Sequence, residues 1–440
     1  MKKIWIGSGA ILLTACVLAA VLVVLPFFIP LERFLPDLTR IVSEKLGQPV
    51  SIGELRLQLL PTPRAIASSI VVGKRQEVRV AELVIVPDLL SMLSGPKTIR
   101  VVSAEGVQLK EAALALPAKL PKNAPGGEEV LVRRVELRRV KLQHSALKVP
   151  EFDLRAELGP GFAPERARLE TRDNALRLAL EAQDGKTAKV RIEATNWTLP
   201  AGYPIKFEWL AGEGLLKGET LNFPKVEGRI YGGKLAASVR ADWAKGYVVS
   251  GKAALSGVDV IPLQKAIGQK PQVSGKLNNE VTFNSRGRTP EQLQNALAAD
   301  GPFALVGGAY HGYDLTQLGL KKLEQGGATT FDELKGNAQV RGQEIKVTDL
   351  CVRSPQFTAA GNVSIAPDDK LSGRLDVSLN KTGGFVGIPV SLGGTTADPS
   401  FAPTKGYVIG AAIGTVLLPG IGTSIGSSIG SRAGGKSECK

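Results

Sequence analysis

The chain has 440 residues, of which 43% are hydrophobic and 22% are charged, a balance that is ordinary for a folded protein. Its formal net charge of +14 would suit a nucleic acid in a cytosolic protein, but the export predicted below excludes that partner. The only cysteines are Cys16, Cys351 and Cys439, so no disulfide framework holds the fold. Cys351 and Cys439 could pair in an oxidising compartment, although we expect both to be free.

The amino terminus is the most informative stretch. Residues 4–30 are apolar almost without interruption and carry no charge, and Lys2 and Lys3 precede them. About twenty apolar residues suffice to cross a bilayer as a helix, and the positive-inside bias keeps the two lysines in the cytoplasm. We therefore predict a single-pass anchor over residues 1–30 that exports the rest of the chain. The anchor residues that we single out are Trp5, Leu12, Leu13, Val21, Phe27 and Phe28.

A cleaved signal peptide and a lipoprotein lipidated at Cys16 are the alternatives to this anchor. The apolar run continues well beyond Cys16, whereas the apolar core of a signal peptide is shorter than this run. The anchor therefore remains the preferred interpretation, and all three readings export the body of the protein.

Beyond the anchor, the period of the apolar residues changes once. Between Leu31 and Leu46 they recur at helical spacing, which predicts a short amphipathic helix. From Val50 onward they alternate with polar residues, which is typical of strands with one apolar and one polar face. The alternating segments are residues 55–59, 107–110, 135–138, 176–180 (loosely) and 190–194. Arginines 133–134 and 138–139 then belong to the polar face of a strand.

Helices are expected to be few. Short ones are predicted over residues 87–93 and 313–324. A third begins at Thr289, because Thr-Pro-Glu-Gln places an N-cap residue, a first-turn proline and a glutamine that completes a capping box. Numerous strands with few helices fit either a sandwich of two sheets or a curled trough, and the alternation alone does not choose between them.

The carboxy-terminal residues form a separate segment, in which glycines recur at multiples of four. These glycines are Gly410, Gly414, Gly422, Gly426, Gly430 and Gly434. Small residues at this spacing let helices approach closely, so we predict a membrane-active or self-associating hairpin, with a disordered tail as the alternative. A dinucleotide-binding loop is rejected because no βαβ unit or downstream acidic residue accompanies the glycines.

Reactive groups are sparse along the chain. His144 and His311 are the only histidines, neither has metal-ligand spacing, and no phosphate-binding loop is present. We expect no enzymatic activity, no cofactor and no metal site. An exported hydrolase is kept only as a remote alternative.

Several segments, taken in their order along the chain, resemble the AsmA family of bacterial envelope proteins. The amino-terminal ones are EKLGQPVSIGELRLQLLPTPRAIASSIVVG and VPDLLSMLSGPKTIRVVSAEGVQL, followed by VEGRIYGGKLAASVRADWAKGYVVSGKAAL. The carboxy-terminal ones are SGKLNNEVTFNSRGRTPEQLQNALAADGPFALVGGAYHGYDL, FDELKGNAQVRGQEIKVTDLCVRSPQFTAAGNVSI and IPVSLGGTTADPSFAPT. Residues 120–205 carry no such motif, and the glycine-rich tail is more regular than the resemblance requires.

The resemblance implies a mainly β protein: a transmembrane helix followed by an elongated, curved antiparallel sheet that forms an apolar groove, as in bridge-like lipid transfer proteins. On this view the segments are the anchor (1–30), two groove segments (31–205 and 206–405) and the tail (406–440). The alternating apolar residues become groove lining, with these candidates: Val107, Leu109, Val135, Leu137, Leu178, Leu180, Val190 and Ile192.

The function that the resemblance implies is phospholipid transport and outer-membrane biogenesis from an inner-membrane anchor, with the bulk of the chain in the periplasm. The expected partners are membrane phospholipids, the inner membrane and outer-membrane or envelope proteins, and nucleic acid is not among them. The alternative function is a non-enzymatic scaffold that assists outer-membrane protein assembly through exposed strand edges.

Overall fold

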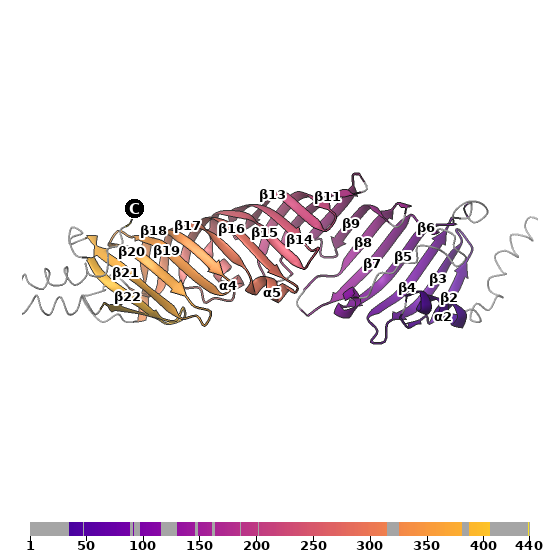
Figure 1. Ribbon diagram of the computed structural model, residues 1–440, viewed down its shortest axis with the longest axis horizontal. Helices are drawn as coiled ribbons and strands as arrows, with labels where there is room; N and C mark the ends of the chain where they lie inside the picture. The colour runs from indigo at the N-terminus through magenta and orange to yellow at the C-terminus, as the bar shows by residue number, and fades with distance from the viewer. Residues whose placement is uncertain are drawn as a thin grey trace, which may run out of the picture. The chain divides into compact units, whose positions relative to one another are not determined.

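The computed structural model is mainly β and consists of two compact units, Met1–Arg191 and Ile192–Lys440, which we describe separately (Figure 1). The structure describes residues 35–46, 48–88, 91, 97–115, 130–145, 148–160, 163–184, 186–200, 202–314, 325–380, 387–404 and 439. The predicted anchor over residues 1–30 and the zipper glycines of the tail lie outside these residues. Within the described ranges, no helix has the length and apolar character needed to span a membrane.

Unit 1 begins with the predicted amphipathic helix, α2 (Leu35–Leu46), which is followed by a series of strands. The strands are β1 (Val50–Ser51), β2 (Glu54–Gln58), β3 (Arg64–Val72), β4 (Val78–Pro87), β5 (Lys97–Lys110), β6 (Val130–Val132), β7 (Arg134–Gln143), β8 (Phe152–Leu158), β9 (Pro164–Thr171) and β10 (Leu176–Ala182). A 3-10 turn, η2 (Glu111–Ala115), follows β5. Strand β11 (Thr187–Thr198) contains the boundary between the units.

The sheet of unit 1 is antiparallel except at one place. Strands β1 and β2 both pair with β3, β2 along its first half and β1 at its end. The pairs β3–β4, β4–β5, β7–β8, β8–β9 and β9–β10 are all antiparallel. Strands β6 and β7 instead pair with β5 in parallel. Parallel neighbours need a crossover of a dozen or more residues, and the chain from Glu111 to Val130 provides it. The family resemblance implied an antiparallel sheet throughout. The parallel pairs were missed because the alternation of a strand carries no information on its direction.

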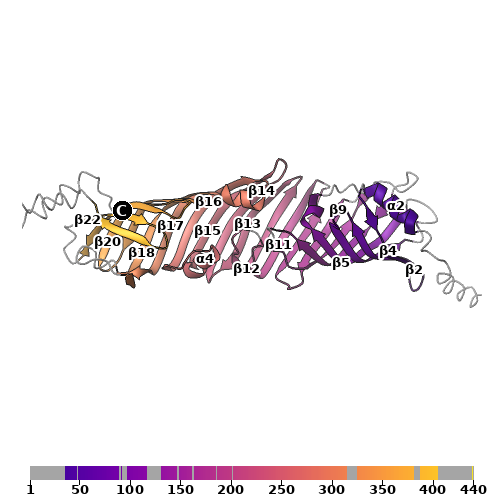
Figure 2. The ribbon, with the colours of Figure 1, turned by 90° about the horizontal axis from the view of Figure 1, so that it is seen from below.

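Unit 2 is an antiparallel meander in which each strand pairs with the next one along the chain (Figure 2). Its strands are β12 (Lys206–Lys217), β13 (Thr220–Ile230), β14 (Gly233–Asp242), β15 (Tyr247–Asp259), β16 (Val273–Gly287), β17 (Ala298–Tyr313), β18 (Gln325–Arg341), β19 (Glu344–Arg353), β20 (Phe357–Ile365), β21 (Leu371–Leu379), β22 (Gly387–Gly394) and β23 (Pro399–Pro403). Such local pairing needs only short turns between most strands.

The sheet of unit 2 curls strongly towards its carboxy-terminal end. Gln272, just before β16, donates a side-chain hydrogen bond of 3.2 Å to the carbonyl oxygen of Ala397, in the turn after β22. Strands β16 and β22 are six positions apart, about 29 Å in a flat sheet, and the two residues belong to opposite strand ends. Only a bent sheet can bring them into contact.

Two short helices connect strands of unit 2. Helix α5 (Pro290–Asn295) starts as predicted, because Thr289 accepts a hydrogen bond from the Gln292 amide at 3.2 Å. The Gln292 side chain accepts from the backbone of Arg288, one residue before the position that a standard capping box uses. Helix α4 (Val260–Ala266), capped by Asp259, was not predicted.

The other two helix predictions are only partly within the described residues. Pro87 is the last residue of β4 and Tyr313 is the last residue of β17, so neither residue begins a helix. Ser91 is helical, whereas residues 89–90, 92–93 and 315–324 lie outside the described ranges.

Candidate functional site

The cross-strand register of unit 1 collects apolar side chains on one face of the sheet. Residues paired directly across a ladder point to the same face, so a chain of paired residues forms a row across the strands. The first row, which we call the Leu57 row, is Leu57, Ala65, Ile85, Val102, Val135, Ala156, Ala167 and Leu180. The second, the Leu55 row, is Leu55, Ala67, Leu83, Ala104, Leu137, Leu154, Leu169 and Leu178. Every member of both rows is apolar, and these rows define the apolar face of unit 1.

Unit 2 has an equivalent apolar face made by two further rows. The Val340 row is Phe223, Val239, Gly251, Phe283, Ala299, Val340, Ile345, Ile365 and Leu371. The Leu305 row is Val258, Leu277, Leu305, Leu334, Val352, Ala359, Val377 and Ile388. Each row continues through consecutive strands without a polar residue.

The two rows of unit 2 differ in burial. Most of the Leu305 row is buried: Val258 is 0% exposed, Ala359 is 3% exposed and Leu305 is 5% exposed. Every residue of the Val340 row is only half-buried. The Leu305 row therefore has neighbours of its own, whereas the Val340 row keeps apolar surface in contact with solvent. Exposed apolar surface that is continuous across many strands is typical of a binding surface.

The opposite face of the same strands is charged. In unit 1, Arg166 lies 3.1 Å from Glu157 and Arg155 lies 3.4 Å from Glu136, on neighbouring strands. Arg134 pairs with Glu157 at 3.7 Å. Within the 133–139 segment, the arginines that form ion pairs therefore lie on the polar face, as predicted. In unit 2, such pairs include Arg341–Asp300 and Arg353–Glu333. Exposed pairs of this kind add little stability, so the charges chiefly keep this face in water.

The structure brings six of the eight groove candidates together. Val135 and Leu180 lie in the Leu57 row, and Leu137 and Leu178 lie in the Leu55 row. Val107 and Leu109 lie on the same face in β5, and both pack in one cluster with Val140 and Leu137. Only Val107 is fully buried, at 4% exposure.

The remaining two candidates lie on β11. Ile192 lies on the apolar side of unit 2, because its Cγ2 is 3.3 Å from the position that a Cβ on Gly212 would occupy. Val190 is half-buried in the same strand and two residues away. The role of all eight residues as lipid contacts stays a prediction.

A recurrent bulge makes these faces continuous, and the sequence analysis missed it. In β3, β5 and β7 the apolar face contains residues three apart, at Ala67 and Ile70, Ala104 and Val107, and Leu137 and Val140. The third residue of each such segment has positive φ: Ser69 at 54°, Gly106 at 66° and Arg139 at 53°. The same pattern occurs in unit 2 at Gly257, Gly307 and Asp349. In β7, β15, β17 and β19 the strand has an extra residue here relative to a neighbouring strand, which is a β-bulge. Strands β3 and β5 stay in register with β4 at this point, although they share the positive φ.

The signal for this bulge was present in the sequence as four-residue segments with apolar first and last residues. Those in unit 1 read ASSI, AEGV and LRRV, and unit 2 has LSGV and VTDL. A bulge reverses the alternation within a strand, so a strict period-2 search places the residues beyond it on the wrong face. Looking for this four-residue pattern would have assigned Ile70, Val140 and Leu350 to the apolar face.

Among the described residues, no member of the four apolar rows is a His, Cys, Ser, Asp or Glu. Among the residues that the structure describes, no three His, Cys, Asp or Glu side chains come close enough to hold a metal ion. His311 Nε2 does lie 3.0 Å from Ser274 Oγ, a proximity that the sequence did not suggest. The Ser274 hydroxyl is already bound to the backbone of Ala309, accepting from its N–H and donating to its carbonyl oxygen. This serine therefore ties β16 to β17.

Shifted pKa values belong to the turns and loops of the sheets. The Thr187 hydroxyl is the main cause of the lowered pKa of Asp184, and the Thr220 hydroxyl lowers the pKa of Asp242 in the same way. Both bonds favour the charged carboxylate. No group with a shifted pKa in the described part of the chain belongs to an apolar row, and the hydrogen bonds behind these shifts hold the turns in which they lie.

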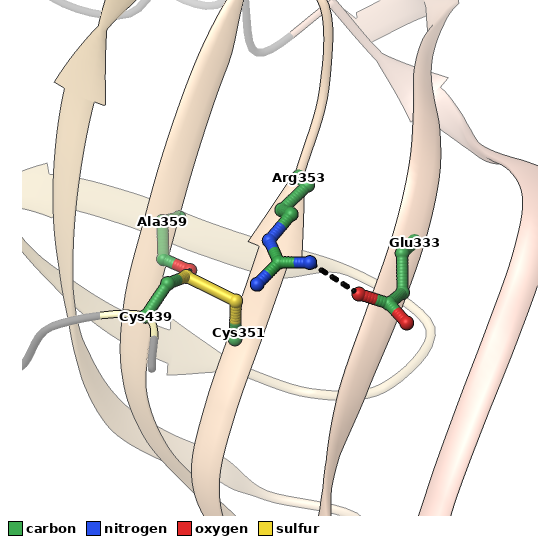
Figure 3. Close-up of a disulfide and its surroundings, with 5 residues drawn as sticks. All are labelled: Glu333, Cys351, Arg353, Ala359 and Cys439. Carbon is green, nitrogen blue, oxygen red and sulfur yellow. Dashed lines mark hydrogen bonds and ion pairs between the residues drawn. A yellow bond between two sulfur atoms is a disulfide. The ribbon is translucent and has the colours of Figure 1, made fainter.

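Cys351 and Cys439 form a disulfide with a Cα–Cα distance of 5.2 Å (Figure 3). The expectation that both are free was wrong, because β19 and the end of the chain come together although 88 residues separate them. Cys351 pairs with Lys335 and Ala360 and so belongs to the polar face, where the Arg353–Glu333 ion pair lies beside it. Sequence spacing alone does not indicate that the end of the chain lies next to β19.

These features define a class: a mainly antiparallel β protein in which each unit's sheet has an apolar face on one side and a charged face on the other. Residues 215–350, from the end of β12 to β19, match the AsmA family. Over these residues the match supports the family resemblance that the sequence motifs predicted. No curated protein and no solved structure is significantly similar to this chain.

Proposed function

We propose that this chain is a non-enzymatic envelope protein that holds phospholipid acyl chains on its apolar faces and supports phospholipid transport and outer-membrane biogenesis. The observation that carries the proposal is the Val340 row. Its side chains form an apolar surface that crosses the strands β13–β21 and stays half-buried. Each buried CH₂ of an acyl chain gains about 0.8 kcal/mol, so a continuous surface of this kind favours long aliphatic chains over small polar ligands.

The proposed location is the periplasm, with an anchor in the inner membrane and the amino terminus in the cytoplasm. The apolar residues 4–30 support the anchor. The Cys351–Cys439 disulfide supports an oxidising compartment, since cytosolic thiols are kept reduced. AsmA-like residues and a large β-sheet fit proteins of the cell envelope. Membrane phospholipids are the proposed partners, together with envelope proteins that would extend the path.

Photo-cross-linking in cells tests the acyl-chain surface directly. A benzophenone amino acid is placed at Val340 or at Ile365 in the full chain, which is expressed in a Gram-negative host. The matched controls carry it at the neighbouring Gln339 or Ser364, whose side chains lie on the polar face. We expect phospholipid adducts at Val340 and Ile365 and none at the controls.

Two other outcomes would overturn the proposal. Equal labelling at all four positions would mean that lipid reaches the protein without regard to the apolar face. A stoichiometric protein adduct at Val340, with no lipid, would support the scaffold function instead.

A further inference from the structure

One strand end of unit 2 exposes two aromatic side chains. Trp243, in the turn between β14 and β15, is 37% exposed, and Tyr247, at the start of β15, is 50% exposed. The turns on either side lie against this one: the Trp243 amide donates to Glu219 O at 3.0 Å, and Tyr247 pairs with Gly287. We call residues 217–220, 242–247 and 286–288 together the aromatic tip.

Both aromatic residues extend the apolar face beyond the last strand pairs. Ala241 and Val249 pair with each other two residues inside the tip, next to the Val239 position of the Val340 row. Trp243 and Tyr247 each lie two residues further towards the turn, so they follow the same face of their strands. The aromatic side chains therefore form the solvent-exposed rim of the apolar face at this end.

The tip also gathers cations that have no acidic partner. Lys217, Lys245, Arg286 and Arg288 are exposed, and none of them has an ion pair with any residue that the structure describes. Elsewhere in unit 2 several exposed arginines are paired, as in Arg229–Glu208 and Arg341–Asp300, whereas Arg240 on β14 has no ion pair with a described residue. Four unpaired cations therefore lie on the same turns as the exposed aromatic rings.

The acidic residues of the tip do not cancel this charge. Asp242 accepts a 2.7 Å hydrogen bond from the Thr220 hydroxyl and a 3.2 Å bond from the Ala244 amide, so its carboxylate is used within the turn. Glu219 is the second acid beside four cations. An excess of positive charge remains at the tip.

We propose that the aromatic tip docks on the surface of an anionic phospholipid bilayer. Trp and Tyr are enriched at the membrane–water interface because an amphipathic ring suits that depth. Lys and Arg next to the interface are attracted by anionic head groups, by about 1 kcal/mol each. The tip holds both features on adjacent turns of one strand end. This docking goes beyond acyl-chain binding, and it would stand even if the apolar faces bound no lipid.

Vesicle flotation tests the docking with the complete 440-residue chain. The protein is first reconstituted in phosphatidylcholine nanodiscs, whose bilayer takes up its apolar amino-terminal residues. It is then mixed with vesicles of phosphatidylcholine alone, or of phosphatidylcholine and phosphatidylglycerol in equal parts. We expect it to float only with the phosphatidylglycerol vesicles. K245E/R288E should bind at least about tenfold more weakly, since each basic residue near an anionic surface adds about fivefold in affinity.

The matched controls change the same kinds of residue away from the tip. K234E/K252E makes the same change in net charge on exposed lysines of the polar face, and W209A removes an indole that is 43% exposed in β12. Both should float like the unmodified chain, whereas W243A/Y247A should lose binding. Equal losses in control and tip variants would overturn the proposal, because binding would then follow net charge alone. Unchanged flotation of both tip variants would overturn it as well.

A fluorescent label gives a second, independent reading. Cys16→Ser leaves the disulfide-bonded cysteines in place, and Ala244→Cys then puts an environment-sensitive dye at the tip. Its emission should shift to the blue with phosphatidylglycerol vesicles, while the same dye at Ser250→Cys should not respond. A dye at position 244 that stays in water would contradict the docking even if the chain floats.

Discussion

Breaking the Cys351–Cys439 disulfide should loosen the carboxy-terminal strands selectively. The cross-link closes a loop over a separation of 88 residues, and strands β20–β23 lie inside that loop. In the chain-entropy model, a loop of this length restrains the opened segment by about 4.6 kcal/mol at 25 °C. Removing the bond should therefore raise the population of the open form by up to roughly three orders of magnitude.

Hydrogen exchange of the full chain measures this population strand by strand. C439A is the cleanest perturbation, because it breaks the bond and leaves the buried Cys351 in place. Amides of β20–β23 should exchange much faster, whereas amides of β13–β16, which lie outside the loop, should keep their protection. Chemical reduction of the unmodified chain should reproduce the pattern, and C351A/C439A should add only the small cost of an emptied thiol site.

Either of two results would refute this reasoning. Unchanged exchange in β20–β23 would mean that the strands are held by packing alone and that loop closure contributes nothing. Equal acceleration in β13–β16 would mean that unit 2 opens as a whole, so that the bond acts on global unfolding rather than on its own loop.

Two further predictions concern the apolar face. Val340→Asp should lower lipid labelling at Ile365 by tenfold or more, because it puts a charge on the Val340 row. Gln339→Asp, on the polar face, should leave this labelling unchanged. Quantitative cross-linking measures both variants, and equal losses would contradict the assignment of faces. Gly361→Ala should destabilise unit 2 by about 1–3 kcal/mol, since its Cβ would lie 2.0 Å from the backbone oxygen of Arg374. Gly393→Ala meets only a movable Ser400 side chain at 3.1 Å and should cost much less; similar midpoints in urea for the two variants would count against this steric argument.

Single strands could be predicted from the sequence because alternation is a property of one strand at a time. Leu55, Leu137 and Leu178 were each assigned to an apolar face, and the structure puts them in one row. Even the irregular Ala179 follows, since it pairs with Arg168 on the polar face. The cap of α5 was predictable for the same reason, as a cap depends on a few neighbouring residues.

What failed depended on contacts between distant segments. The parallel pairing of β5 with β7 needs knowledge of where a crossover returns, and the disulfide needs knowledge of where the chain ends in space. Neither Val102–Val135 pairing nor Cys351–Cys439 proximity leaves a trace in local periodicity. The rows themselves were hidden too, because the register that joins β17 to β18 is fixed by the opposing strand and not by either segment alone.

The bulges connect these local and distant levels. A bulge shifts every later side chain of its strand to the other face, so an apolar face survives only if the sequence skips a residue at the same place. The spacing of Leu137 and Val140 around Arg139 is such a match. A closed core would need the face to be covered, yet the Val340 row stays half-buried along its whole length. A continuous apolar face with a half-buried row along it is the feature that the proposed acyl-chain surface needs.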